Sequence, residues 1–183
     1  DGRRIRVEIG SHRCVLGGEP HAVSIARDIT ERKKTLAALE ASRQELALEN
    51  RIAQVFLLAE GDSIFPEMLD IVLEILESRH GYFGYIDGDG NLVCPSMTRG
   101  ILDRCEVPGK SILFPKSNWG GLWGRSLYRK QTLFANGGLK LPDGHLALGC
   151  ALVVPILHHK ELIGQFAVAD RPDGYEEVQA RRL

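Results

Sequence analysis

The chain has 183 residues, of which 44% are hydrophobic and 26% are charged, as is typical of a folded globular protein. Its formal net charge is -1, so no overall field attracts nucleic acid or an anionic membrane surface. No apolar run approaches the roughly 20 residues that a membrane-spanning helix needs. We therefore expect neither a nucleic-acid partner nor direct membrane contact.

The cysteines indicate a reducing environment. Cys14, Cys94, Cys105 and Cys150 are widely separated and form no C-x-x-C pair, so zinc-binding and thioredoxin-like motifs are missing and we expect no metal site. The charged start, DGRRIRVEIG, does not have the pattern of a signal peptide. We expect reduced thiols, a cytoplasmic location and a larger parent polypeptide.

Residues 3 to 27 predict a two-stranded β-hairpin. Charged and apolar side chains alternate in RRIRVEI, and Gly17-Gly18 supplies a turn before a second strand-like run. An isolated hairpin leaves an apolar face uncovered. We therefore expect it to be the edge of a larger sheet or to pack against a partner chain.

A helix of about thirty residues follows, because no proline or glycine interrupts the sequence before Gly61. Asp28 or Thr30 can cap its start. With Leu36 at heptad position a, Leu39 and Leu46 fall at d, which predicts a short seam for a homodimer. The alternative is a single helix exposed to solvent.

From residue 64 onward the pattern predicts a compact α+β domain. An amphipathic helix begins at Ile64 and is expected to end at Gly81, and a hairpin turns around residues 87–90. A short tryptophan-containing helix, a strand at 132–136 and a long hairpin at 150–170 follow. Strands alternating with helices in this way favour a central antiparallel sheet with helices on its faces.

Two stretches resemble known signalling domains. GEPHAVSIARDITERKK resembles the end of a PAS domain, in which Asp28, Ile29 and Thr30 would form the junction with a signalling helix. WGGLWGRSL, LPDGHLALGCALVVPIL and ELIGQFAVADRPDGY resemble a GAF domain of sensor histidine kinases. The resemblance implies a PAS remnant at 1–30, a linker helix at 31–50 and a GAF domain at 51–183, with about six antiparallel strands and helices on both faces.

The GAF resemblance also implies a small-molecule pocket on one face of the sheet. Trp119 and Trp123 are four residues apart and would share one face of a helix at the pocket wall. The alternative is that both rings fill the core. The complete set of candidate pocket residues is Trp119, Trp123, Phe114, Leu127, Met97 and His145.

A haem or thiol site is a further hypothesis. Some GAF sensors hold haem through cysteine or histidine, and Cys94-Pro95 resembles a haem-thiolate dipeptide; the candidates are Cys94, Cys105 and His145. The alternative is that the cysteines are small buried hydrophobic residues.

The sequence carries no motif of a hydrolase, a zinc protease or a P-loop nucleotide-binding protein. We therefore expect a non-catalytic sensory input module of a multidomain protein, most often a histidine kinase, that binds an unknown small molecule and signals through dimeric helices to an output domain. The rival interpretation is a structural dimerisation module whose own side chains fill the pocket. A haem or thiol redox sensor is the third.

Overall fold

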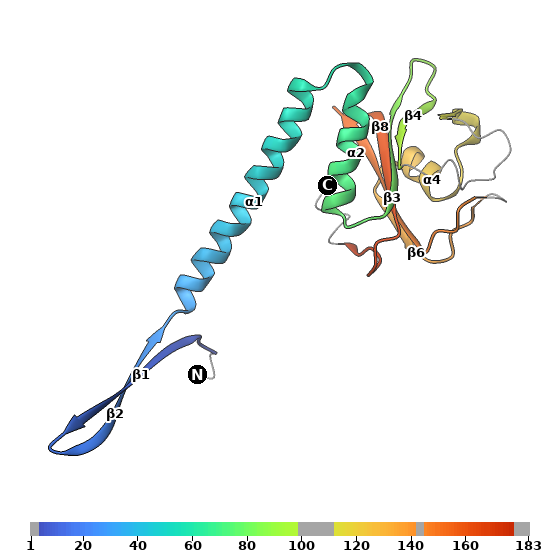
Figure 1. The fold of residues 1–183 in the computed structure, drawn as a ribbon. Coiled ribbons are helices and arrows are strands. Elements are labelled where there is room, and N and C mark those ends of the chain that lie inside the picture. The colour runs from blue at the N-terminus through green and yellow to red at the C-terminus, as the bar shows by residue number, and fades with distance from the viewer. Residues whose placement is uncertain (1–3, 99–111, 142–144, 178–183) are drawn as a thin grey trace. The chain divides into compact units, whose positions relative to one another are not determined.

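The computed structural model describes residues 4–98, 112–141 and 145–177, and the chain divides into two compact units, residues 1–51 and 52–183. In the first unit, strands β1 (Val7–Leu16) and β2 (Glu19–Asp28) form an antiparallel hairpin (Figure 1). Gly17 and Gly18 make its turn with φ values of 62° and 90°, a left-handed conformation that glycine adopts readily. The predicted hairpin is confirmed.

The helix α1 (Thr30–Leu58) has 29 residues and begins directly after β2. The Asp28 carboxylate accepts a hydrogen bond of 2.8 Å from the backbone N–H of Thr30, as a helix cap does. The backbone of Arg6 is bonded twice to this junction, since its carbonyl accepts from Ile29 N–H at 2.9 Å and its N–H donates to Thr30 Oγ1 at 2.8 Å. These hydrogen bonds tie the residue before β1 and the end of β2 to the start of α1.

The second unit is built on a six-stranded antiparallel sheet with the strand order β5-β4-β3-β8-β7-β6. This confirms the predicted α+β class and sheet. The strands are β3 (His80–Ile86), β4 (Leu92–Met97), β5 (Leu113–Phe114), β6 (Leu133–Asn136), β7 (Cys150–His158) and β8 (Glu161–Ala169).

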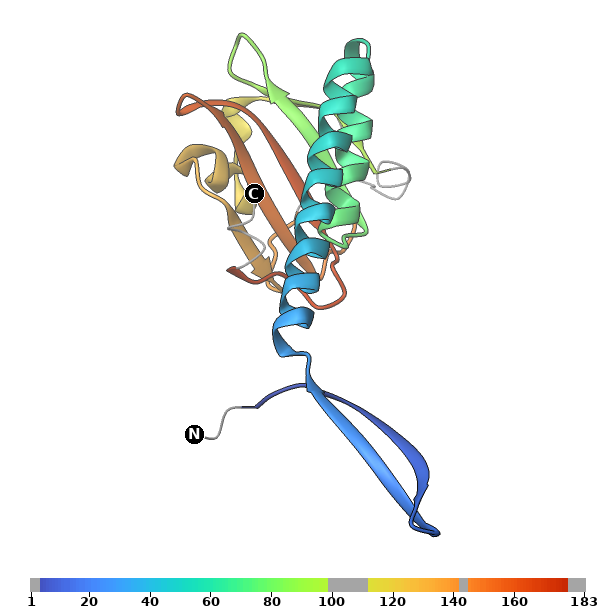
Figure 2. The same ribbon diagram turned by 90° about the vertical axis from the view of Figure 1, so that its left-hand side faces the viewer.

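The helices α2 and α4 cover opposite faces of this sheet (Figures 1 and 2). The helix α2 (Ile64–Ile75) follows a 3-10 turn, Gly61–Ser63, and buries Val72 against an apolar cluster that contains Leu152, Phe166 and Val168. The helix α4 (Gly121–Arg129) follows the 3-10 turn Lys116–Asn118 and buries Leu127 against the other face.

The expected end of α2 was wrong. The helix ends at Ile75, the chain turns at Glu77 with a φ of 50°, and Gly81 lies inside β3. A Cβ atom on Gly81 would lie 2.5 Å from the carbonyl oxygen of Ala167 and 3.2 Å from a methyl carbon of Leu69. Gly81 is therefore needed for the close packing of β3 against its neighbours, and it does not end a helix.

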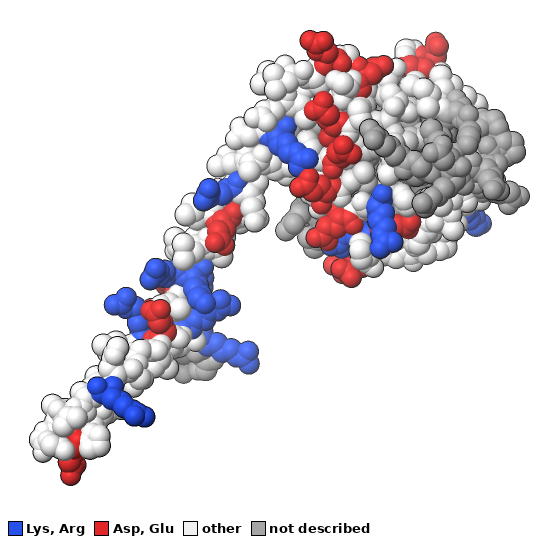
Figure 3. Space-filling model, in the orientation of Figure 1, with Lys and Arg blue, Asp and Glu red and all other residues white. Residues whose placement is uncertain are grey.

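Figure 3 shows that the charged side chains are unevenly distributed. Basic residues gather where β2 meets α1, in the segment that contains Arg27, Arg32, Lys33 and Lys34, while acidic residues follow α2. The small net charge thus results from the cancellation of separate basic and acidic surfaces.

Candidate functional site

The alternation of side chains along each strand identifies the residues on the face of the sheet that α4 covers. Because Gly81 faces Leu69 of α2, its neighbours His80 and Tyr82 point to the α4 face. The strand registers then define two rows across β3, β8, β7 and β6. The first row is His80, Ala169, Ala151 and Ala135, and the second is Tyr82, Ala167, Val153 and Leu133.

Five of the six predicted pocket residues meet in one cluster on this α4 face. Its buried centre is Leu92, Cys94 and Leu127. The partly buried residues that pack against this centre are Tyr82, Ile86, Met97, Phe114, Trp119, Trp123 and Leu162. The cluster therefore brings Phe114, Trp119, Trp123, Leu127 and Met97 together with Cys94 as packed apolar residues.

The two tryptophans do not share a helix face. Trp119 precedes α4, with an extended ψ of 111°, and its ring lies edge-on to Tyr128 at 5.3 Å, while its Nε1–H donates to the carbonyl of Phe114 at 3.2 Å. Trp123 lies within α4 and meets the Phe114 ring at 5.6 Å. The interruption between them is Gly121, whose φ of 59° is left-handed.

Gly124 explains how Trp119 and α4 fit together. A Cβ atom at this position would lie 2.4 Å from the carbonyl carbon of Trp119, well inside van der Waals contact. The glycine is fully inside the helix, where it costs about 1 kcal/mol relative to alanine. The close approach of the Trp119 backbone therefore requires a residue without a side chain.

A buried hydrogen-bond network ties α4 to the sheet. Gln165 of β8 has no exposed surface; its Oε1 accepts from the Tyr82 hydroxyl at 2.5 Å and its Nε2 donates to the Trp123 carbonyl at 3.1 Å. Burial, and to a lesser degree the Cys94 thiol, raises the pKa of Tyr82 well above its usual value. Sequence reasoning did not identify Gln165, although a single polar residue inside the apolar run LIGQFAVA was an available signal.

Two further polar atoms on this side are buried and have no hydrogen-bond partner, namely Ser126 Oγ of α4 and His80 Nδ1 of β3. Ser126 has no exposed surface. The other ring nitrogen of His80, Nε2, lies 3.9 Å from Oδ2 of Asp170, whose Oδ1 accepts from the Gly149 N–H at 2.7 Å. Buried polar atoms are nearly always paired in folded proteins, so unpaired ones mark a place where a partner belongs.

Of the haem and thiol candidates, the structure describes Cys94 and His145. Cys105 lies outside the described residues. His145 is half-buried, and its Nδ1 is hydrogen-bonded to the neighbouring Leu146 carbonyl at 2.8 Å. Cys94 is completely buried, and burial raises its thiol pKa to about 12. The thiolate, which binds iron and attacks electrophiles, is thus strongly disfavoured at Cys94.

We expect this buried thiol to make the protein sensitive to alkali. The folded pKa of Cys94 is raised from 9.0 to about 12, so its contribution to stability is complete below pH 9 and is lost as the pH rises from 9 to about 12. Urea unfolding at pH 8 and pH 10 should show a fall in unfolding free energy that is about 1.4 kcal/mol larger in the wild type than in Cys94→Ala. Equal falls in the two proteins would contradict the assignment.

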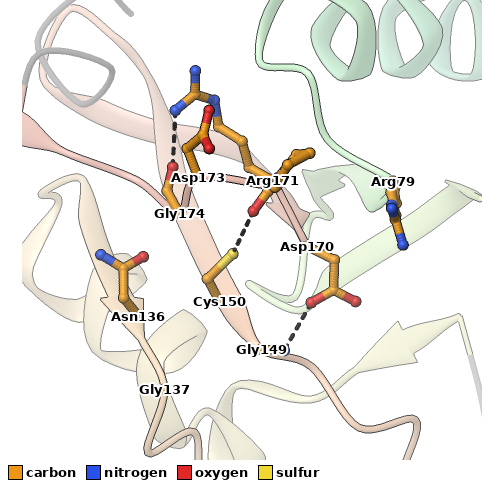
Figure 4. A pocket seen from close by; sticks show the side chains of 10 residues that line it. Arg79, Asn136, Gly137, Gly149, Cys150, Asp170, Arg171, Asp173 and Gly174 are labelled. Atoms are coloured by element: carbon orange, nitrogen blue, oxygen red, sulfur yellow. Dashed lines mark hydrogen bonds between the residues drawn. The ribbon is translucent and has the colours of Figure 1, made fainter.

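An open pocket lies at the ends of β6, β7 and β8, with a volume of about 610 Å³ (Figure 4). Arg171 is one of the residues that line it, and its guanidinium donates at 2.9 Å both to the Gly174 carbonyl and to the Glu77 carboxylate. Among the residues that the structure describes, no predicted site residue lines this pocket. The lining residues are Arg79, Asn136, Gly137, Gly149, Cys150, Asp170, Arg171, Pro172, Asp173 and Gly174.

Metal binding finds no support in the described part of the chain, where no three His, Cys, Asp or Glu side chains form a group that could hold an ion. No helix in that part of the chain combines the length and the apolarity that crossing a bilayer requires.

Comparison with known proteins found a related sensor. A methyl sulfide methyltransferase-associated sensor of Methanosarcina acetivorans is 27% identical over 194 residues, a match that covers 100% of this chain and 19% of that protein. The chain thus spans about a fifth of the length of that relative, since it covers 19% of it.

Solved structures show the same fold. The GAF domain of a phosphoenolpyruvate-protein phosphotransferase from Acinetobacter has a TM-score of 0.56 at 13% identity, with 74% of this chain and 82% of that chain covered. The corresponding domain from Coxiella burnetii has a TM-score of 0.57 at 16% identity, with 74% and 83% covered. A model of the GAF domain family matches residues 59–183. The chain therefore belongs to the GAF domain family.

Proposed function

We propose that this chain is the sensory input module of a multidomain signal-transduction protein, with a histidine kinase as the parent. A small molecule binds between α4 and the sheet, and the signal passes through α1 helices paired in a dimer. The sensor named among the relatives supports this proposal, as does its length, which leaves room for an output domain.

The observation that carries the proposal is the polar character of the α4 face. The α2 face is an apolar cluster in which Leu152 and Val168 are almost completely buried. The α4 face instead buries Gln165 and the unpaired hydroxyl of Ser126, and it also carries the partly buried aromatic residues Tyr82 and Trp123. A ligand pocket typically combines an apolar and aromatic lining with a few placed polar groups.

The proposed coupling uses the junction between β2 and α1. At this junction the backbone N–H of Thr30 donates to the Asp28 carboxylate, and the backbone of Arg6 is hydrogen-bonded to both Ile29 and Thr30. A displacement of the helix start would therefore move the hairpin. The seam residues Leu36, Leu39 and Leu46 are 48%, 57% and 54% exposed on the single chain. A second α1 helix would cover this apolar stripe.

We expect Leu39→Glu to weaken the dimer, because a carboxylate in the seam would be desolvated and would face its symmetry mate. Sedimentation equilibrium should show a dissociation constant raised by about 10-fold or more, since 1.4 kcal/mol corresponds to tenfold. Gln44→Glu adds the same charge at heptad position b of the same helix and should leave the mass unchanged. A wild-type chain that is monomeric throughout would remove the helix pair from the proposal.

Native mass spectrometry of the freshly purified chain, compared with its denatured mass, tests ligand binding. An additional mass that is lost on denaturation supports the sensor and identifies the ligand class. An increment that survives denaturation indicates covalent attachment, with Cys105 and Cys94 as the first sites to map. Trp119 and Trp123 are the only tryptophans and both lie in the α4-face cluster, so their fluorescence reports on this side of the sheet.

A second candidate function, a structural dimerisation module, is favoured by one observation. Leu127 is only 1% exposed and is packed by Phe114, Trp119 and Trp123, so part of the α4 side is filled by the chain's own residues. A bare dimer in the native spectrum, with tryptophan fluorescence unchanged by any small molecule tested, would select this function.

A further inference from the structure

We propose that the open pocket at the ends of β6, β7 and β8 binds a free basic α-amino acid, such as lysine. Arg79 binds the carboxylate of this ligand, Asp170 binds its α-ammonium group, and Asp173 binds the cation at the end of its side chain. The described residues that line this pocket include none of the α4-face cluster, so the inference goes beyond the proposed function and does not depend on it.

The pocket has the size of a small-molecule site. Its volume of about 610 Å³ falls within the range of about 300–1,000 Å³ that is usual for ligand pockets. Four segments that are far apart in the sequence form its walls, namely the residue before β3, the end of β6, the start of β7 and the loop after β8 (Figure 4). A ligand in this pocket would therefore contact all four segments.

Hydrogen bonds fix the walls of the pocket without a ligand. The Oδ1 atom of Asp170 accepts from the Gly149 N–H at 2.7 Å, which joins the loop after β8 to the start of β7. Arg171 donates to the Gly174 carbonyl and to the Glu77 carboxylate, both at 2.9 Å. A site whose walls are already held in place loses less conformational entropy when a ligand binds.

Three charged groups of the pocket remain available to a ligand. The Arg171 guanidinium is already engaged by the two bonds just described. Among the described residues, neither the Arg79 guanidinium nor the Asp173 carboxylate forms a hydrogen bond or an ion pair. The Oδ2 atom of Asp170 lies 3.9 Å from Nε2 of His80, which is too long for a hydrogen bond. One cation and two anions are therefore available.

Arg79 and Asp170 are neighbours on adjacent strands. His80 pairs with Ala169 in the antiparallel register of β3 and β8, and the Arg79 N–H donates to the Ala169 carbonyl at 3.0 Å. Arg79 and Asp170 are the next residues on each side, and residues opposite each other in such a pair have Cβ atoms about 5 Å apart. Figure 4 shows Asp173 farther from Arg79, beyond Cys150.

The signs and positions of these groups define the ligand. A planar guanidinium matches the geometry of a carboxylate, and a carboxylate accepts hydrogen bonds from an ammonium group. The α-carboxylate and α-ammonium groups of an amino acid are close together, as Arg79 and Asp170 are. The remaining carboxylate, Asp173, then favours a ligand whose side chain ends in a cation.

The other lining residues add no competing charge. Both amide atoms of Asn136 are used by the backbone of Tyr175, since Nδ2 donates to its carbonyl and Oδ1 accepts from its N–H, each at 2.9 Å. Cys150 and Pro172 are uncharged and also line the pocket. The methylene groups of a lysine side chain can therefore cross this part of the pocket without burying a charge.

Isothermal titration calorimetry of the dialysed chain with three probes tests the ligand class. L-lysine carries all three charged groups, norleucine lacks the ammonium group of the side chain, and cadaverine lacks the carboxylate. L-lysine should bind at least about 5-fold more tightly than either analogue, because each analogue loses one charged contact in an open pocket. Equal binding of L-lysine and either analogue, or no binding of L-lysine, would overturn the inference.

Two variants assign the contacts, and each has a control outside the pocket. Arg79→Gln should remove the preference for L-lysine over cadaverine, and Asp173→Asn should remove the preference over norleucine. Arg129→Gln, at the end of α4, and Asp89→Asn, between β3 and β4, make the same changes of charge on exposed residues and should retain both preferences. Preferences that persist in the two pocket variants, or that the controls lose equally, would overturn the inference.

Discussion

Replacing Leu127 by alanine should lower the free energy of unfolding by about 2–5 kcal/mol, the range for a large-to-small change in a well-packed core. Leu127 is 1% exposed and lies at the centre of the α4-face cluster with Leu92 and Cys94. The change would remove the main apolar contact between α4 and the sheet. Urea unfolding monitored by far-UV circular dichroism measures the difference.

The matched control is Leu58→Ala, because Leu58 is 77% exposed and also lies in a helix. Its unfolding free energy should change by less than about 0.5 kcal/mol, as for ordinary surface substitutions. A Leu127→Ala protein as stable as this control would show that α4 does not contribute to the core.

Replacing Gly124 by alanine should destabilise the protein by about 1–3 kcal/mol, although alanine is the better helix former by about 1 kcal/mol. The added Cβ would lie 2.4 Å from the carbonyl carbon of Trp119, which is backbone and cannot rotate away. We also expect a shifted tryptophan emission maximum, because Trp119 must move from its contact with Tyr128.

Gly88→Ala is the control for Gly124→Ala, since a Cβ on Gly88 would meet nothing within 4 Å and its φ is not left-handed. Its stability should remain within about 0.5 kcal/mol of the wild type, with unchanged emission. If Gly124→Ala were as stable as Gly88→Ala, the close approach of the Trp119 backbone would not constrain α4.

Most of the fold could be predicted from local patterns. The alternation in RRIRVEI and the Gly17-Gly18 turn predicted the hairpin, and the absence of proline and glycine before Gly61 predicted the long helix, which the structure ends at Leu58. These features depend on residues close together in the chain, so periodicity and turn chemistry are sufficient to find them.

Glycines were harder to interpret, because the same residue serves different needs. Gly81 was expected to end a helix but lies in β3, where the Ala167 carbonyl leaves no space for a side chain. Gly121 breaks the expected helix between Trp119 and Trp123 with a left-handed φ. Only the position of a neighbouring strand or segment decides between these roles.

The sequence alone was sufficient to recognise the GAF family, because the family motifs are carried by the chain itself. Only the tertiary structure placed Gln165, Ser126 and His80 on the same side of the sheet, since they come from β8, α4 and β3. Whether a buried polar atom finds a partner depends on distances between segments far apart in sequence, and no local pattern encodes them.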